Sequence, residues 1–138
     1  KNKLSNLHIG ILCAMPEEVG STLDNLNNIT SKKYGDLEIF SGELICDDFK
    51  EKKLDISIAW SGWGKVSSAR AATRIINSND EKKPIDILIF TGVAGSTQKD
   101  INQWDIVIAS ETIQHDMDAR PLFAKNVIPA YDGLTINL

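Results

Sequence analysis

Two nearly continuous apolar runs, Leu7–Cys13 (LHIGILC) and Ile85–Phe90 (IDILIF), constrain the fold more than any other feature of the sequence. A strand without alternation of polar and apolar residues is typical of a sheet that is buried on both faces. We therefore predict that both runs are central strands of one sheet, with other elements packed above and below it. Such an arrangement belongs to the α/β class.

The remaining elements follow from the spacing of apolar residues. Three further segments are predicted as strands: Leu37–Leu44, Leu54–Trp60 and Asp105–Ile113. Two segments have helical spacing: Glu17–Leu26, with the stripe Val19, Leu23 and Leu26, and Lys65–Asn77, with the stripe Val66, Ala69, Thr73 and Ile76. The order β-α-β-β-α-β-β predicts a mixed central sheet flanked by helices. No linker divides residues 1–138, so we expect a single domain.

Charge and composition narrow the classes of partner. The net charge is −4 and the pI is about 5.1, whereas a sequence-independent nucleic-acid binder presents a basic face. No apolar run approaches the roughly 20 residues of a membrane helix, so we expect no membrane partner. Cys13 and Cys46 lie in predicted strands without metal-like spacing, which favours buried thiols and a cytoplasmic location. Residue 1 is lysine, so a removed leader stays open.

Three segments follow predicted strands directly: AMPEEV, SGWGKV and TGVAGS. In open α/β sheets, ligands bind outside the carboxyl ends of the strands. Gly92 and Gly95 lack a Cβ and let the backbone approach a ligand, although TGVAGS is neither a dinucleotide fingerprint nor a Walker A loop, and a plain turn explains it equally well. Trp63 either caps an apolar ligand or covers the sheet edge. The coincidence of the three segments predicts a small-molecule site.

Acidic residues offer two candidate groups. Glu17 and Glu18 fall in the first turn of a predicted helix, where the helix dipole favours carboxylates, and this accounts for one of them. The alternative is that one acid is a catalytic base at the strand end. His115, Asp116 and Asp118 suggest a metal site or a proton relay, but loop-ordering hydrogen bonds are favoured because no further ligand cluster is near in sequence.

Six segments taken together carry a family resemblance: IGILCAMPEEV, YGDLEIFSGEL, SGWGKVSSARAATRII, PIDILIFTGVAGS, DIVIASE and HDMDARPL. In this order and spacing they resemble the N-terminal half of the 5′-methylthioadenosine/S-adenosylhomocysteine nucleosidases, which belong to the purine nucleoside phosphorylase and uridine phosphorylase superfamily. The resemblance covers about residues 8–129. It implies a nucleoside phosphorylase-like fold, and AM-x-E-E-V and TG-x-AG are its most specific parts.

The resemblance implies hydrolysis of the N-glycosidic bond of 5′-thio-substituted adenosines, with release of adenine and without a cofactor or metal. The transition state is ribosyl-cation-like, and the family's water-activating glutamate falls on Glu18. Ala14 and Met15 match residues that line the ribose and the water. Trp63 falls where the family has an apolar residue beside the substrate tail.

Further positions are implied in the same way. Val93, Ala94 and Gly95 match the glycine-rich loop under the nucleoside. Ala119 and Leu122 match residues that reach across a dimer interface into the neighbour's alkylthio pocket, so the resemblance implies a homodimer. The family often has serine where this chain has Val93, which removes a hydroxyl. Trp63 is large enough to reshape the thio-substituent pocket, so substrate preference stays open.

Other members of the superfamily supply alternatives. The phosphorylases hold phosphate with arginines, including positions where this chain has Glu17–Glu18 and Phe90–Gly92, and two carboxylates repel phosphate. Hydrolysis is therefore favoured over phosphorolysis. Two alternatives stay open: a catalytically inactive nucleoside-binding or storage homologue, and a nucleosidase or phosphorylase for another purine nucleoside, such as futalosine or AMP.

The family's second half supplies a general-acid aspartate, a glutamate that grips the ribose hydroxyls, and the adenine-binding backbone. Neither ME-[MA]-E nor SD-x-A follows residue 129. We therefore expect residues 1–138 to be the N-terminal portion of the domain, in a fragment or a nicked protein. The alternatives are that a separate polypeptide carries the rest or that this copy is inactive.

Overall fold

The computed structural model of the chain describes residues 7–46, 52–78, 83–129 and 135–137. The contacts divide the chain into two units, Lys1–Ala94 and Gly95–Leu138. We call these the first and second units and describe each by itself.

A mixed sheet of five strands forms the first unit, in the order β2-β3-β4-β1-β5. Strand β1 pairs in parallel with β4 and β5, whereas β3 pairs antiparallel with β2 and β4. The mixed α/β sheet and the interior position of β1 are therefore as predicted. The strands are β1 (His8–Cys13), β2 (Asn27–Tyr34), β3 (Leu37–Cys46), β4 (Lys52–Trp60) and β5 (Ile87–Phe90).

Strand β2 is absent from the sequence-based prediction. Its residues are mostly polar and almost all exposed, so they lack the apolar alternation that marks a half-buried strand. The sequence signal that could have found it is the pair Gly35–Asp36 directly before β3. In the structure this pair forms the turn between β2 and β3, and Gly35 adopts a left-handed φ of 68°. Turns with this conformation, followed by an alternating strand, favour a hairpin.

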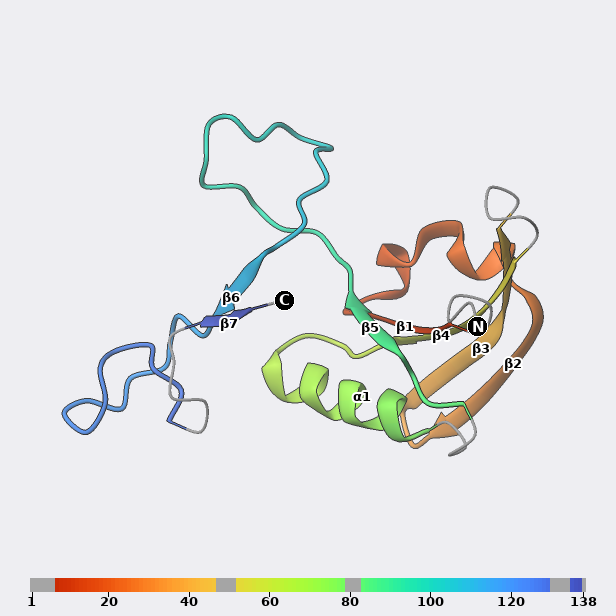
Figure 1. The fold of residues 1–138 in the computed structure, drawn as a ribbon, viewed down its shortest axis with the longest axis horizontal. Coiled ribbons are helices and arrows are strands. Elements are labelled where there is room, and N and C mark those ends of the chain that lie inside the picture. Colours follow the sequence, from red (N-terminus) through yellow and green to blue (C-terminus); the bar gives the residue numbers. More distant parts are fainter. Residues whose placement is uncertain (1–6, 47–51, 79–82, 130–134, 138) are drawn as a thin grey trace. The chain divides into compact units, whose positions relative to one another are not determined.

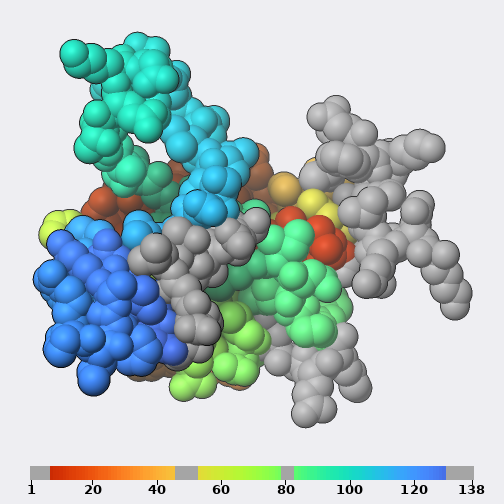
Figure 2. All heavy atoms as spheres, turned by 60° about the vertical axis from the view of Figure 1, so that its left-hand side comes forward, coloured from red at the N-terminus to blue at the C-terminus, as the bar shows by residue number. Residues whose placement is uncertain are grey.

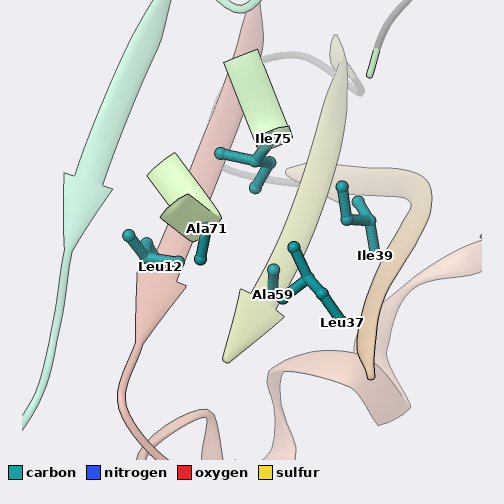
Figure 3. Packing of buried hydrophobic residues seen from close by; sticks show 6 residues of the cluster. All are labelled: Leu12, Leu37, Ile39, Ala59, Ala71 and Ile75. Atoms are coloured by element: carbon teal, nitrogen blue, oxygen red, sulfur yellow. The ribbon is translucent and has the colours of Figure 1, made fainter. Parts of the chain in front are cut away.

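Helix α1 (Lys65–Asn77) has the predicted bounds, but the predicted stripe is wrong. Ala71 and Ile75 are fully buried, whereas Val66 is 85% exposed and Ile76 50% exposed. Figure 3 shows Ala71 and Ile75 directed at Leu12, Leu37, Ile39 and Ala59 of the sheet.

Two contacts on one side of α1 fit its orientation. The guanidinium of Arg70 lies 2.7 Å from a carboxylate oxygen of Asp36, and that of Arg74 lies over the ring of Tyr34, 4.6 Å from its centroid. Both contacts tie this side of the helix to the β2–β3 turn. The neighbouring side, with Ala71 and Ile75, packs on the sheet, where apolar burial stabilises it.

The opposite face of the sheet is covered by residues 16–26, and the sequence predicted one helix over Glu17–Leu26. They form two 3₁₀ helices instead, η2 (Pro16–Glu18) and η3 (Gly20–Asn25), seen in orange-red above β1 in Figure 1. Gly20 has φ of 56°, which an α-helix does not allow, and this interrupts the helix. Val19 and Leu26 are nevertheless buried against the sheet, as two members of the predicted stripe.

Strand β5, predicted to be central, lies at the edge of the described sheet. Its four side chains have exposed fractions between 37% and 62%, and its segment lies at the surface in Figure 2 (pale green). In the second unit, β6 (Glu111–Ile113) pairs with β7 (Thr135–Asn137). The strand predicted over Asp105–Ile113 is thus confirmed only for its last three residues. Within the described residues, no helix combines the length and apolar character needed to cross a membrane.

Two adjacent isoleucines of α1 test which face is buried. Ile75→Ala is expected to lower the free energy of unfolding by about 2–5 kcal/mol, because it leaves a cavity in the core. Ile76→Ala, at a half-exposed position, is expected to cost less than about 1 kcal/mol. Urea unfolding of both variants measures the difference, and equal losses would contradict the observed packing.

Candidate functional site

Parallel pairing brings the three strand-end segments to one edge of the sheet. The registers of β1 end at Cys13 opposite Trp60 of β4, and at Leu12 opposite Phe90 of β5. Beyond these pairs the ladder continues, since the N–H of Ser61 donates to the Cys13 carbonyl and the N–H of Thr91 to the Leu12 carbonyl. AMPEEV, SGWGKV and TGVAGS therefore begin side by side, as predicted.

Glu18 lies at the centre of this edge. Its Oε2 accepts hydrogen bonds from the backbone N–H groups of Ala14 at 2.8 Å and Met15 at 3.1 Å. Its Oε1 accepts a longer bond of 3.3 Å from the N–H of Val93, in the loop after β5. The short turn Pro16–Glu18 makes this possible, because the Glu18 N–H donates to the Met15 carbonyl and brings the side chain back over the strand end. One carboxylate thus joins the loops that follow two parallel strands.

Gly92 permits this close approach, and sequence reasoning assigned it only general backbone freedom. A Cβ at Gly92 would lie 3.0 Å from Oε1 of Glu18 and 3.3 Å from its carboxyl carbon. Real Cβ contacts are seldom so short, so a larger residue would displace the carboxylate. The sequence signal is a glycine placed two residues after the end of β5.

Hydrogen bonding fixes the charge of Glu18. The N–H groups of Ala14 and then Met15 lower the pKa of the carboxyl from its ordinary value, burial opposes this, and the Val93 N–H adds to the lowering. The side chain is therefore a carboxylate at neutral pH, held in one orientation. It can accept a hydrogen bond from a water molecule and stabilise nearby positive charge, but a lowered pKa makes it a weak base.

The two neighbours of Glu18 differ from it in environment. Glu17 is exposed, and η2 is only three residues long, so the helix dipole proposed from the sequence gives it little stabilisation. Cys13 is fully buried beneath the turn, and its thiol lies 3.3 Å from the Met15 carbonyl oxygen. Burial, and then the charge of Glu18, raise the pKa of the Cys13 thiol, so it stays neutral.

The other predicted site residues fall in both units. Trp63 is 78% exposed between Gly62 and Gly64, whose φ values are 76° and 94°. Val93 is 84% exposed, and Ala94 is also exposed. The structure therefore groups Ala14, Met15 and Val93 around Glu18, with Trp63 at the same sheet edge. Three predicted residues belong to the second unit, where Gly95 and Leu122 are exposed and Ala119 is half-buried.

The HDMD segment orders its own loop. Asp118 accepts hydrogen bonds from the backbone N–H of Arg120 at 3.2 Å and from its Nε at 2.8 Å, and the side-chain bond is the main reason that the pKa of Asp118 is lowered. Among the residues that the structure describes, no group of three or more His, Cys, Asp or Glu side chains is arranged to hold a metal ion. Loop-ordering hydrogen bonds, the favoured interpretation, are confirmed for Asp118.

Gly92→Ala tests the approach of Glu18 to the β5 loop. The added methyl should push the carboxylate away from Val93 and weaken their hydrogen bond, so the Glu18 pKa should rise toward its ordinary value. A ¹³C NMR titration of the Glu18 carboxyl measures this. Gly95→Ala is the matched control, because no atom lies within 4 Å of a Cβ there. An unchanged midpoint in Gly92→Ala would contradict the geometry.

Comparison with known proteins supports the family resemblance. The sequence matches the phosphorylase superfamily over residues 8–135. It is 32% identical over 126 residues to a 5′-methylthioadenosine/S-adenosylhomocysteine nucleosidase of Buchnera aphidicola, covering 91% of this chain and 49% of the relative. It is 35% identical over 112 residues to a nucleosidase of the same name from Shewanella piezotolerans, covering 81% and 44%. The chain spans about half the length of the curated relatives it matches.

Solved structures show the same likeness. The Streptococcus pyogenes S-adenosylhomocysteine nucleosidase, in complex with 5-methylthiotubericidin, matches with a TM-score of 0.81 and 25% identity over 98% of this chain and 52% of that one. The Neisseria meningitidis 5′-methylthioadenosine/S-adenosylhomocysteine nucleosidase, in complex with methylthio-immucillin-A, matches with a TM-score of 0.78 and 28% identity. The match covers 94% of this chain and 52% of that one. A futalosine hydrolase mutant of Helicobacter pylori matches with a TM-score of 0.78 and 27% identity, over 95% of this chain and 54% of that one. By sequence and by its mixed sheet, the chain belongs to the phosphorylase superfamily.

Proposed function

We propose that this chain carries the water-binding half of an N-glycosidic hydrolase that acts on 5′-methylthioadenosine or S-adenosylhomocysteine. The observation that carries the proposal is the carboxylate of Glu18, fixed by the N–H groups of Ala14, Met15 and Val93 at the carboxyl edge of the sheet. Relatives named as nucleosidases for these substrates support the substrate class.

In the proposed reaction, the N-glycosidic bond breaks and its electron pair leaves with adenine, which takes up a proton. The oxygen of a water molecule bonds to the anomeric carbon, and the water's proton passes to Glu18. Because hydrogen bonds lower the Glu18 pKa, orienting the water and stabilising the ribosyl cation are its larger contributions. Groups outside these residues would protonate adenine and hold the ribose, since the chain spans 49% of the Buchnera aphidicola relative.

Water is favoured over phosphate as the nucleophile. A phosphate site needs cationic side chains, and the contacts of Glu18 are neutral backbone N–H groups. Glu17 and Glu18 at the turn, together with Thr91 and Gly92 in the facing loop, supply no positive charge. The carboxylates would also repel a phosphate dianion.

A different purine nucleoside is the second candidate substrate. The likeness to the Helicobacter pylori futalosine hydrolase structure, at 27% identity, favours this alternative. Trp63 and Val93 support the same alternative. The exposed indole of Trp63 and the valine at position 93, where the family often has serine, give the surface near the Glu18 carboxylate a different shape and polarity from that of the nucleosidases. Competition between methylthioadenosine and futalosine in one assay separates the candidates.

Adjacent glutamates test the assignment of the base. Adenine release from 5′-methylthioadenosine is measured with the chain alone and with an added polypeptide that carries the second half of the relatives' length. In the active form, Glu18→Gln should lower kcat by about 10²-fold to 10⁴-fold. Glu17→Gln, at the exposed neighbour, should leave kcat unchanged. Full turnover by Glu18→Gln would reject Glu18 as the base, and nucleoside binding without any hydrolysis would favour an inactive homologue.

The proposed protein is a homodimer that uses Ala119 and Leu122 at its interface. Leu122 is 85% exposed in the chain, so an aspartate there should leave the fold intact and disrupt only association. We expect Leu122→Asp to convert the dimer to a monomer in analytical ultracentrifugation. Val107→Asp, at another exposed apolar position, is the control. A monomeric parent chain, or a dimer that survives Leu122→Asp, would contradict this interface.

A further inference from the structure

The two peptide units that hold Glu18 are also bound on their other side, by the segment that follows β4. The N–H of Ser61 donates to the Cys13 carbonyl at 2.8 Å, and the N–H of Gly62 donates to the Ala14 carbonyl at 3.0 Å. The Cys13 carbonyl belongs to the same peptide unit as the Ala14 N–H, and the Ala14 carbonyl to the same unit as the Met15 N–H. In a trans peptide unit the C=O and N–H point in opposite directions. Ser61 and Gly62 thus set the direction in which both amides face Glu18.

The Ser61 side chain holds this segment in place. Ser61 is 7% exposed, and its hydroxyl oxygen lies 2.7 Å from the Gly62 carbonyl oxygen and 3.3 Å from the Cys13 carbonyl oxygen. A hydroxyl has one proton to donate, and the shorter contact to Gly62 takes it. Gly62 has φ of 76°, a conformation that glycine readily leaves for others. The hydroxyl therefore restrains a glycine peptide that would otherwise have wide conformational freedom.

We propose that Ser61 is a positioning residue for Glu18, acting through the backbone of Ser61 and Gly62 and the two peptide units that they bind. Ser61 has no hydrogen bond to the Glu18 carboxylate itself. It acts on the carboxylate through the N–H groups of Ala14 and Met15. The effect of this role on catalysis rests on the hydrolysis proposed above. The geometry itself exists without substrate, so it can be tested in the 138-residue chain.

The test is the ¹³C NMR titration of the Glu18 carboxyl in variants of position 61. Ser61→Ala should raise the midpoint by about half a pH unit or more, because looser amides stabilise the carboxylate less. Ser61→Thr keeps the hydroxyl and should return the midpoint toward that of the parent. Ser31→Ala, on exposed β2, is the control and should change nothing. A folded Ser61→Ala chain with the parent midpoint would overturn the proposal.

A second measurement needs no variant. If the peptide units transmit the charge of Glu18, the amide protons of Ser61 and Gly62 should shift with the same midpoint as the Glu18 carboxyl, because hydrogen-bonded amides polarise one another. Flat titration curves at both amides would overturn the proposal even where Ser61→Ala fails to fold. Neither titration depends on turnover. A chain that shows both responses but hydrolyses no nucleoside would keep the positioning role and reject the proposed function.

Discussion

The parallel pairing of β1 with β4 and β5 is the constraint on which the site depends. It aligns Cys13 with Trp60 and Leu12 with Phe90, so that three loops leave the sheet at one edge. Gly10 fits this register, since a Cβ there would lie 2.8 Å from the terminal methyl group of Ile85 and 3.0 Å from one of Leu88. A slip of one residue would exchange the two faces of β1 and place a side chain in that space.

At the strand end, two ionisable groups that lie close together are held in opposite protonation states. Glu18 is kept ionised by neutral N–H donors and so needs no cationic partner. The buried Cys13 thiol below it is kept neutral, partly by the charge of that carboxylate. At this edge the Glu18 carboxylate is therefore a negative charge that backbone N–H groups hold in place. That arrangement suits a reaction in which positive charge develops on the substrate and disappears again, because little reorganisation is needed.

Local patterns predicted local structure well and long-range placement poorly. The bounds of α1 and the existence of β1, β3 and β4 followed from periodicity and apolar runs. The buried face of α1 did not, because it depends on packing against residues of β1, β3 and β4 that are distant in sequence. Residues 17–26 kept a helical apolar spacing, but the φ of Gly20 excluded one continuous helix.

The candidate site divides in the same way. The turn with Glu18 could be found from the strand that precedes it and from the family motif. Its bond to Val93 spans 75 residues of sequence and depends on the pairing of β5 with β1, which no local pattern specifies. The contribution of Gly92 depends on its contact with the Glu18 carboxylate, which is distant in sequence, so no local pattern reveals it. Ser61 was hidden for the same reason, since its N–H binds the Cys13 carbonyl on another strand.

The position of β5 has a consequence for the behaviour of the chain in solution. Within the described residues β5 pairs only with β1, so its outer backbone groups face away from any ladder, and its four side chains are apolar and at least 37% exposed. Such an edge is a template for strand addition. A lysine introduced on the β5 edge is therefore expected to slow association between copies of the chain.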